Sequence, residues 1–383
     1  MIVISMLLIV VSGVLYSQDN VADRIRAAQT SGNYAEAAQL YRQLIAAGTD
    51  TPEVRSNYGL MLHLAGKNRE ALEQFQIALR SNANLAAANL FAGVSELDLG
   101  EPKPALPYLK KAQELDPAHA VPLLALGKAY VALAEYHSAN EAYTKAAALN
   151  AHLAEAWYGI GVTDRSMAEA ILNQAARSGR ILDEVATRDA HLLLDAALEA
   201  LNRAVQLEPN SARTHLLMAE SLSDAGKLVE AVTEYHAALK LDPGLDAAYL
   251  GLASTYWKQR QFDEALPLLK RVLQKSPKDA EANGMMADIL EHNGDHAGAQ
   301  HYAEIALVSN PRLIDTRVVL ARIYLAKQEP KLAIGELRQV ISADTDGSYH
   351  FLLYRAYRDA GNEQAAQKAM AEFKRLRYGA NKQ

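Results

Sequence analysis

Residues 154–162 read AEAWYGIGV and residues 195–209 read DAALEALNRAVQLEP, and the segment 165–191 between them reads RSMAEAILNQAARSGRILDEVATRDAH. The first stretch has the spacing of the first helix of a two-helix unit, with a small residue at Gly161. The second has the spacing of the second helix and ends at Pro209, because proline cannot continue a helix. We therefore interpret both stretches as one helical hairpin interrupted by about two dozen extra residues.

The same unit recurs every 34 residues along the chain. One register of small residues consists of Gly59, Gly93, Gly127, Gly161, Ala219, Ala253, Ala287 and Ala321, and the step into Ala219 is longer by 24. A second register consists of Ala37, Ala71, Ala105, Ala139, Ala197, Ala231, Ala265, Ala299 and Ala333. The ends of units carry Pro117, Pro209, Pro243, Pro277 and Pro311. Three registers with one shared step indicate a tandem array of helical hairpins.

This pattern resembles the tetratricopeptide repeat family, whose 34-residue unit is a helix–turn–helix. The resemblance covers residues 18–380 and implies an all-α fold, a right-handed superhelix of helical hairpins. We count ten units, which start near Gln18, Pro52, Ala86, Ala120, Ala154, Ala212, Asp246, Ala280, Ile314 and Gly347. The first helix of several units should turn at Gly66, Gly100, Gly226, Gly294 and Gly361, where a helix end favours glycine.

The fifth unit, residues 154–211, should differ from the others by an inserted helical extension near residues 168–190. The economical interpretation lengthens both helices by about ten residues each, or roughly 15 Å, so that a helical hairpin projects from the array. We expect no domain boundary in this unit. Its tip should carry four apolar side chains that either hold the two arms together or form a second partner contact: Ile171, Leu172, Ile181 and Leu182.

Residues 2–15 form an apolar run, IVISMLLIVVSGVL, which is shorter than the roughly 20 residues of a membrane-spanning helix. The run has the length of the apolar region of a secretory signal, although no Lys or Arg precedes it. We predict that residues 1–17 are a signal peptide and that the protein is exported to the periplasm or the extracellular space. An uncleaved N-terminal membrane anchor is the alternative.

The composition argues against several classes of function. The net charge of −6 is mild and predicts no nucleic-acid binding, and the absence of cysteine excludes thiolate chemistry. The histidines His292, His296 and His301 straddle an expected turn, so we predict no metal site and no cofactor. The sequence contains no recognisable set of nucleophile, base and acid, and we predict that the protein is not an enzyme.

In the resembled family, the first helices of successive units line a concave groove that holds a peptide or a partner helix. The matching side chains here predict a groove lined by Leu90, Val94, Leu124, Tyr158, Arg165, Leu216, Glu220, Trp257, Asp288, Arg322, Arg355 and Arg358. Several of the apolar ones could equally pack between helices, and the arginines near the end could simply be solvated. We predict a non-catalytic protein-interaction scaffold or assembly factor with a protein or peptide partner, of undetermined oligomeric state. A regulatory subunit of an enzyme complex and a membrane-tethered, self-assembling repeat protein are the alternatives.

Overall fold

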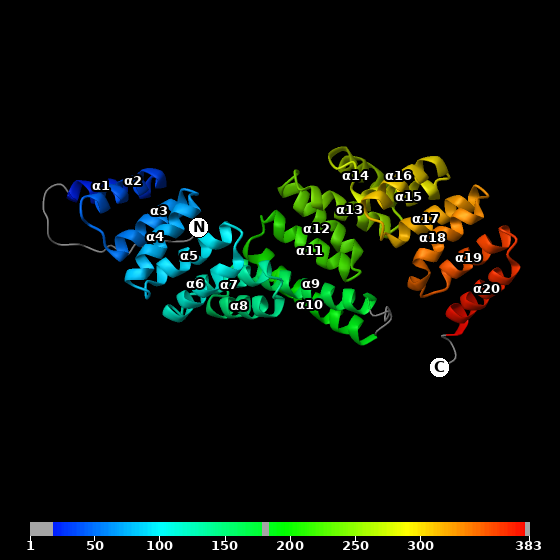
Figure 1. Cartoon of the computed structure of the whole chain (residues 1–383), viewed down its shortest axis with the longest axis horizontal. Coiled ribbons are helices and arrows are strands. Elements are labelled where there is room, and N and C mark those ends of the chain that lie inside the picture. Colours follow the sequence, from blue (N-terminus) through cyan, green and yellow to red (C-terminus); the bar gives the residue numbers. More distant parts are fainter. Residues whose placement is uncertain (1–17, 178–183, 380–383) are drawn as a thin grey trace. The chain divides into compact units, whose positions relative to one another are not determined.

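The computed structural model describes residues 18–177 and 184–379. Within these residues the chain forms twenty α-helices and one short 3-10 helix, without any strand (Figure 1). The expected all-α fold of helical hairpins is confirmed. The predicted signal or anchor segment, residues 1–17, and the predicted tip residues Ile181 and Leu182 lie outside the described part of the chain.

The chain divides into two compact units at Gly159 and Ile160, within the stretch where we expected no boundary. Unit 1 contains α1 (Gln18–Thr30), α2 (Tyr34–Ala46), α3 (Pro52–Leu64), α4 (Asn68–Ser81), α5 (Ala86–Asp98), α6 (Pro102–Leu115), α7 (Ala120–Ala132), α8 (Tyr136–Leu149) and the start of α9 (Ala154–Arg177). Unit 2 contains the rest of α9, then α10 (Glu184–Leu207), α11 (Ala212–Asp224), α12 (Leu228–Leu241), α13 (Asp246–Lys258), α14 (Phe262–Lys275), α15 (Ala280–His292), α16 (His296–Ser309), α17 (Ile314–Ala326), α18 (Pro330–Val340), η1 (Ile341–Ala343), α19 (Ser348–Asp359) and α20 (Glu363–Tyr378).

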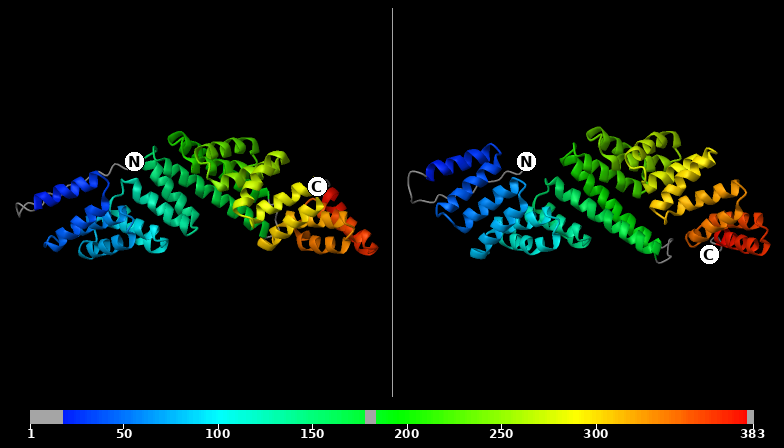
Figure 2. Two further views of the ribbon diagram at one scale, coloured as in Figure 1. Left: turned by 90° about the horizontal axis from the view of Figure 1, so that it is seen from above. Right: turned by 45° about the horizontal axis from the view of Figure 1, so that its top comes forward.

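In unit 2 each helix from α10 onward packs against the next one, and the first helices of successive hairpins also touch each other (Figures 1 and 2). These first-helix contacts run from α11 to α13, α15, α17 and α19. Side chains on the first helices therefore lie close to those of the neighbouring hairpins, which positions the candidate site below.

The 34-residue step arises from close helix packing. Every alanine of the second register, from Ala37 to Ala333, has an exposed fraction of 0%. The glycines of the first register are equally constrained, since a Cβ atom on Gly127 would lie 2.6 Å from the ring of Tyr143. Tyr143 also packs against Gly159, where a Cβ atom would again lie 2.6 Å away. Small residues thus recur because the facing position holds a large side chain and interiors pack without free space.

The turns between paired helices use a left-handed residue, as predicted. The five expected glycines all have positive φ angles, from +74° at Gly226 to +83° at Gly294. Three hairpins reach the same conformation without glycine, at Ala134, Arg260 and Gln328, with φ angles of 57° to 61°. Non-glycine residues pay a steric penalty there, so the hairpin packing imposes the turn even where the sequence does not favour it.

A recurring hydrogen bond closes the junction between successive hairpins. In six first helices the fourth residue donates a side-chain hydrogen bond to the carbonyl oxygen six residues earlier, in the preceding turn. The donors are Asn89, Trp157, His215, Tyr249, Asn283 and Arg317, with donor–acceptor distances of 2.7 to 3.4 Å. Because a carbonyl group in the turn between two helices has no partner within either helix, this hydrogen bond satisfies it and stabilises each junction with whichever polar side chain is present.

The helices α9 and α10 are 24 residues long, whereas the other α-helices have 11 to 16 residues. Beyond the length of an ordinary first helix, Ala168 packs with Ala190 and Leu194 in a small apolar cluster. Ile171 and Ala225 contact the same cluster, so the extended pair is also attached to the end of α11. The extra residues therefore continue both helices of the fifth hairpin.

Candidate functional site

The first helices of unit 2 present polar side chains that pair with one another across neighbouring hairpins. The Trp257 Nε1 group donates to Asp288 Oδ2 at 2.9 Å, and Arg322 Nη2 donates to Asp288 Oδ1 at 2.6 Å. Arg322 Nε lies 3.3 Å from Glu291 Oε2, and Arg260 Nη1 lies 3.6 Å from Asp288 Oδ2. Asp288, with a total exposed fraction of 7%, thus interacts with one indole and two guanidinium groups.

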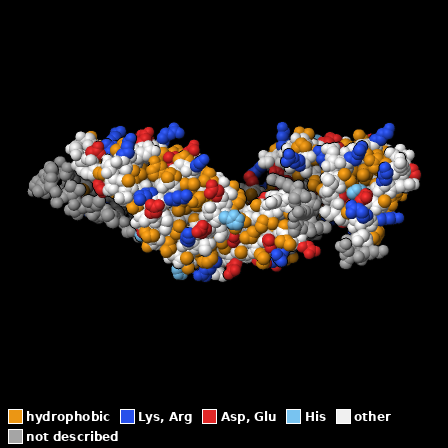
Figure 3. Space-filling view, turned by 60° about the horizontal axis from the view of Figure 1, so that its bottom comes forward, with side chains coloured by type: hydrophobic (Ala, Val, Ile, Leu, Met, Phe, Trp, Pro, Cys, Tyr) orange, Lys and Arg blue, Asp and Glu red, His pale blue; other side chains and the backbone are white. Residues whose placement is uncertain are grey.

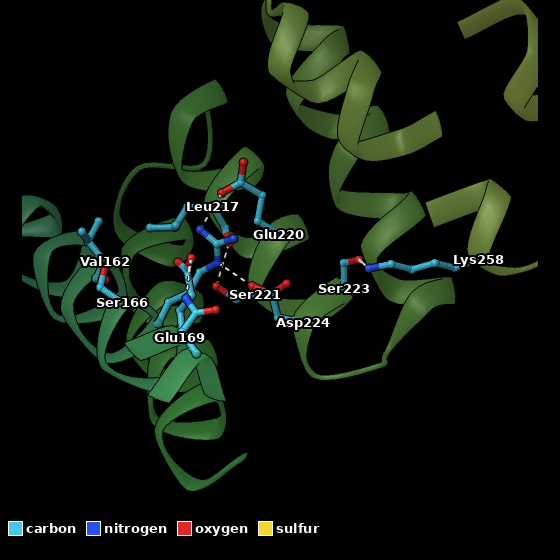
Figure 4. Close-up of polar contacts among 11 residues, drawn as sticks. Val162, Ser166, Glu169, Leu217, Glu220, Ser221, Ser223, Asp224 and Lys258 are labelled. Carbon is cyan, nitrogen blue, oxygen red and sulfur yellow. Dashed lines mark hydrogen bonds and ion pairs between the residues drawn. The ribbon is translucent and has the colours of Figure 1, made fainter. Parts of the chain in front are cut away.

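A second cluster joins α9 to α11. Arg165 Nη1 lies 3.0 Å from Glu220 Oε2, and Arg165 Nε donates to Asp224 Oδ2 at 2.8 Å. Figure 4 shows Glu220, Asp224 and Glu169 around the guanidinium group. We call Arg165, Glu220 and Asp224 the arginine clasp. On the next hairpin, Lys258 Nζ donates to Ser223 Oγ at 3.2 Å.

Burial and charge act in opposite directions in the arginine clasp. Loss of hydration opposes the charge of Arg165, but Asp224 and Glu220 outweigh it and raise the pKa of the guanidinium. Loss of hydration raises the pKa of Glu220, and the Arg165 charge only partly offsets that rise. Three carboxylates therefore surround one arginine, and this part of the first-helix surface is acidic.

Next to Asp288 the surface opens into a hollow of about 770 Å³, which lies entirely within unit 2. The hollow is lined by Trp257, Arg260, Asp288, Asp315, Val318, Arg322, Asp346, Ser348, Tyr349, Phe351, Leu352, Phe373, Arg377 and Tyr378. These side chains come from α13, α15, α17, α19 and α20 and the turns beside them. The volume lies within the range of ligand-binding pockets, and the lining combines aromatic rings with six charged side chains.

The aromatic wall of the hollow is formed mainly by α19 and α20. The rings of Phe351 and Phe373 are 5.2 Å apart between centroids, and those of Phe373 and Tyr378 are 6.1 Å apart. Phe351 and Tyr378 keep exposed fractions of 39% and 62%. Large aromatic side chains left partly in water beside a hollow favour contact with a partner, since burying them is favourable.

The two carboxylates on the α17 and α19 side of the hollow differ in their surroundings. Asp346 accepts a hydrogen bond from the Ser348 backbone at 2.9 Å and pairs with Arg377, and these contacts lower its pKa. Asp315 makes no hydrogen bond or ion pair with any described residue. Loss of hydration, followed by the charge of Asp288, raises the pKa of Asp315, and Arg322 opposes the rise.

The predicted groove residues divide into four groups in the structure. Trp257, Asp288 and Arg322 line the hollow, and Arg165 and Glu220 belong to the arginine clasp. The apolar ones are buried or half-buried on their own helices: Leu90, Val94, Leu124, Tyr158 and Leu216. Arg355 and Arg358 are exposed and do not line the hollow; Arg358 pairs with Asp359 at 2.9 Å.

Sequence reasoning missed most of the hollow, including Asp315, Tyr349, Phe351, Phe373 and Tyr378. Asp315 occupies the second position of its first helix, which carries Glu155 and Glu281 in other units and reads as an ordinary helix start. Phe373 and Tyr378 come from a second helix, α20, which the groove prediction did not consider. The clustering of aromatic residues in the last unit was the available signal.

The predicted hairpin contact is only partly described. Ile171 is half-buried against the apolar cluster of α9 and α10, whereas Leu172 keeps an exposed fraction of 39%. On the same pair, Val185 and Leu192 are exposed by 56% and 63%. The arms therefore contact each other through Ile171 and leave other apolar side chains in solvent.

The histidines of the described chain show no metal-like arrangement. No group of three or more His, Asp or Glu side chains among the described residues could hold a metal ion. His292 stacks edge-on against Phe262 at 5.0 Å, and His301 stacks against Tyr302 at 5.6 Å. Both rings therefore take part in aromatic packing.

One Ser–His–Asp group exists in unit 1, at Ser95, His63 and Asp98. Ser95 Oγ lies 3.2 Å from His63 Nδ1, and Asp98 Oδ2 lies 3.8 Å from the same ring nitrogen. A catalytic triad requires the two oxygens on opposite ring nitrogens and an accessible hydroxyl, but Ser95 is 0% exposed. This group is therefore a packing contact.

On the face shown in Figure 3, basic and acidic side chains are interspersed with apolar ones and form no continuous basic stripe. A nucleic-acid interface typically shows such a stripe. Among the described helices, none combines the length and the apolar character that crossing a bilayer requires.

Comparisons with known proteins agree with the repeat pattern. Two sequence models, both described as tetratricopeptide repeat, match residues 23–68, 65–120 and 188–246 and residues 222–289 and 256–307, more than half of the chain. Anaphase-promoting complex subunit 7 of Homo sapiens is 26% identical over 152 residues, which are 39% of this chain and 27% of that protein. Cellulose synthase operon protein C of Xanthomonas axonopodis pv. citri (strain 306) is 26% identical over 181 residues, 45% of this chain and 12% of that protein.

The chain spans about a quarter, or less, of the length of these two relatives. Among solved structures, YrrB, described as a TPR protein with an unusual peptide-binding site, aligns with a TM-score of 0.41 and 22% identity. That alignment covers 54% of this chain and 95% of YrrB. On its 34-residue registers, its paired helices and the matched repeat models, the chain belongs to the tetratricopeptide repeat family.

Proposed function

We propose that this protein is a non-catalytic interaction scaffold or assembly factor that binds a polypeptide segment in the hollow of unit 2. Membership of the repeat family supports a protein-interaction scaffold in general. The observation that carries the specific proposal is the hollow of about 770 Å³ with the half-exposed rings of Phe351 and Tyr378. Several aromatic groups and six charged side chains in one open space suit a peptide or a partner helix.

Placing a photo-crosslinking amino acid at Phe351 of the full chain tests this proposal. The matched control carries the same amino acid at Val308, which is 84% exposed on the second helix α16 and does not line the hollow. We expect a discrete crosslinked protein from position 351 that position 308 does not yield, and that Trp257→Ala weakens. The same crosslinks from both positions, or none from position 351, would remove the hollow as the binding site.

We further propose that the protein acts outside the cytoplasm, in the periplasm or the extracellular space. The apolar run of residues 2–15 supports export. Mass spectrometry of the protein from its native cells tests this, because export with cleavage would start the mature chain near residue 18. An intact Met1 would contradict cleavage and favour a membrane tether instead.

A further inference from the structure

The charges that line the hollow are unevenly satisfied. Arg322 and Arg260 pair with Asp288, and Arg377 pairs with Asp346. Among the charged side chains lining the hollow, Asp315 alone lacks an ion pair or hydrogen bond to a described residue. The unsatisfied charge that a ligand meets there is therefore negative.

A carboxylate in the first turn of a helix has an ordinary explanation, because it stabilises the positive end of the helix dipole. Glu281 occupies the same position of α15, one repeat earlier, and does not line the hollow. If Asp315 served only this purpose, its carboxylate form should be favoured. The pKa of Asp315 is instead raised, by lost hydration and then by the nearby charge of Asp288, while Arg322 opposes the rise.

The aromatic side chains that line the hollow together with Asp315 suit a cation as well as an apolar group. Trp257, Tyr349 and Phe351 line the same hollow, and ring faces attract guanidinium and ammonium groups. An arginine or lysine side chain with its aliphatic stem can satisfy both the rings and the carboxylate. An acidic ligand would instead have to compete with Asp288 and Asp346 for the three arginines of the hollow, which are already paired with them.

We propose that the hollow binds a peptide segment that places an arginine or lysine side chain on Asp315 and a neighbouring aromatic side chain against Phe351 and Phe373. This inference rests on the proposed function, since it names the chemistry of the bound segment. Asp315 selects for the cation, and the rings of α19 and α20 supply the larger apolar contact.

Trp257 provides a direct reporter for binding. The chain contains two tryptophans, and Trp157 lies in unit 1, so a Trp157→Phe background leaves Trp257 as the only indole. The probes are three peptides: acetyl-Ala-Phe-Arg-Phe-Ala-amide and its citrulline and glutamate counterparts. Citrulline keeps the size of arginine without its charge. We expect saturable fluorescence changes with the arginine peptide and an affinity about ten-fold higher than with the citrulline peptide.

Two variants in that background decide the role of the carboxylate. Asp315→Asn should reduce the arginine preference to roughly none, whereas Glu281→Gln, which removes the same charge one repeat away, should keep it. Equal binding of the arginine and citrulline peptides, no binding of any peptide, or equal loss in both variants would overturn the inference. A retained crosslink from position 351 alongside such a result would leave the scaffold proposal intact and remove only the charge selection.

Discussion

At the scale of single residues, the charged Asp315 is expected to lower the free energy of unfolding, and it is also the residue proposed to bind the cation. Its pKa is raised by lost hydration and by the charge of Asp288, while the charge of Arg322 opposes the rise. A carboxyl group with a raised folded pKa stabilises the fold below its unfolded pKa, near 4, and loses that contribution as pH rises through the folded pKa. At neutral pH the charged Asp315 therefore disfavours the folded state.

Asp315→Asn should consequently raise the free energy of unfolding at pH 7 and change it little at pH 3.5. Thermal unfolding at both values, with Glu281→Gln as the control, measures this. Lower stability of Asp315→Asn at pH 7 would show that the carboxylate is satisfied in the free protein.

Gly127 shows why the repeat requires a small residue at this position, since the Tyr143 ring packs where a Cβ atom would lie. Gly127→Ala places a methyl group 2.6 Å from the Tyr143 ring, which Gly159 confines on its other side. We expect a loss of about 1–3 kcal/mol in chemical denaturation, as for other overpacked interiors.

Gly335 is the matched control, because it also lies in a helix and a Cβ atom there would meet nothing within 4 Å. Gly335→Ala should be stabilising by about 0.5–1 kcal/mol, since alanine is the better helix former. Two glycine variants with the same sign of effect would contradict the packing argument.

At the scale of elements, the arginine clasp fastens α9 to α11. Arg165→Met leaves Glu220 and Asp224 without their partner, in positions where side-chain exposed fractions are 29% and 40%. We expect a loss of about 1–2 kcal/mol, less than for a fully buried pair because solvent screens the charges. A double-mutant cycle with Glu220→Gln measures the coupling, and simple additivity of the two losses would show that they do not interact.

Sequence spacing could predict the helices because every unit places small and large side chains at the same helix positions. The alanine register, the turn glycines and the extra length of α9 and α10 all follow from local spacing and small residues. Ala134, Arg260 and Gln328 gave no such signal, because the turn there is imposed by the surrounding hairpin. The boundary at Gly159 and Ile160 lies inside a continuous helix, where no change in composition indicates it.

The site was harder to predict, because its contacts join residues that no local pattern relates. Trp257 and Arg322 were found as inward-facing side chains, but their shared partner Asp288 is 31 and 34 residues away. A sequence does not show whether a tryptophan indole already has a hydrogen-bond acceptor within the protein. Asp315 was missed for the opposite reason, since only the structure shows that it makes no hydrogen bond or ion pair with a described residue.

At the scale of the whole molecule, each hairpin contacts mainly its neighbours, as expected for a repeat array. Such arrays tolerate the gain or loss of a complete repeat if the packing positions stay in step. Removing residues 212–245 would meet this condition: Asp246 would follow Ser211, and Tyr249 would have the Pro209 carbonyl six residues before it. The packing alone would therefore accept the shorter chain.

The ion pairs of the arginine clasp would be lost in the shortened chain. In the shortened chain Ser254 replaces Glu220 and Lys258 replaces Asp224, so Arg165 meets a hydroxyl and another cation. We expect a folded but less stable array, measured by chemical denaturation, and partial recovery on adding Arg165→Gln. Full stability without that change would refute this expectation. The arginine clasp therefore depends on which repeat follows the hairpin of α9 and α10, so a recombination event that removes that repeat would lose the ion pairs even though every helix still packs.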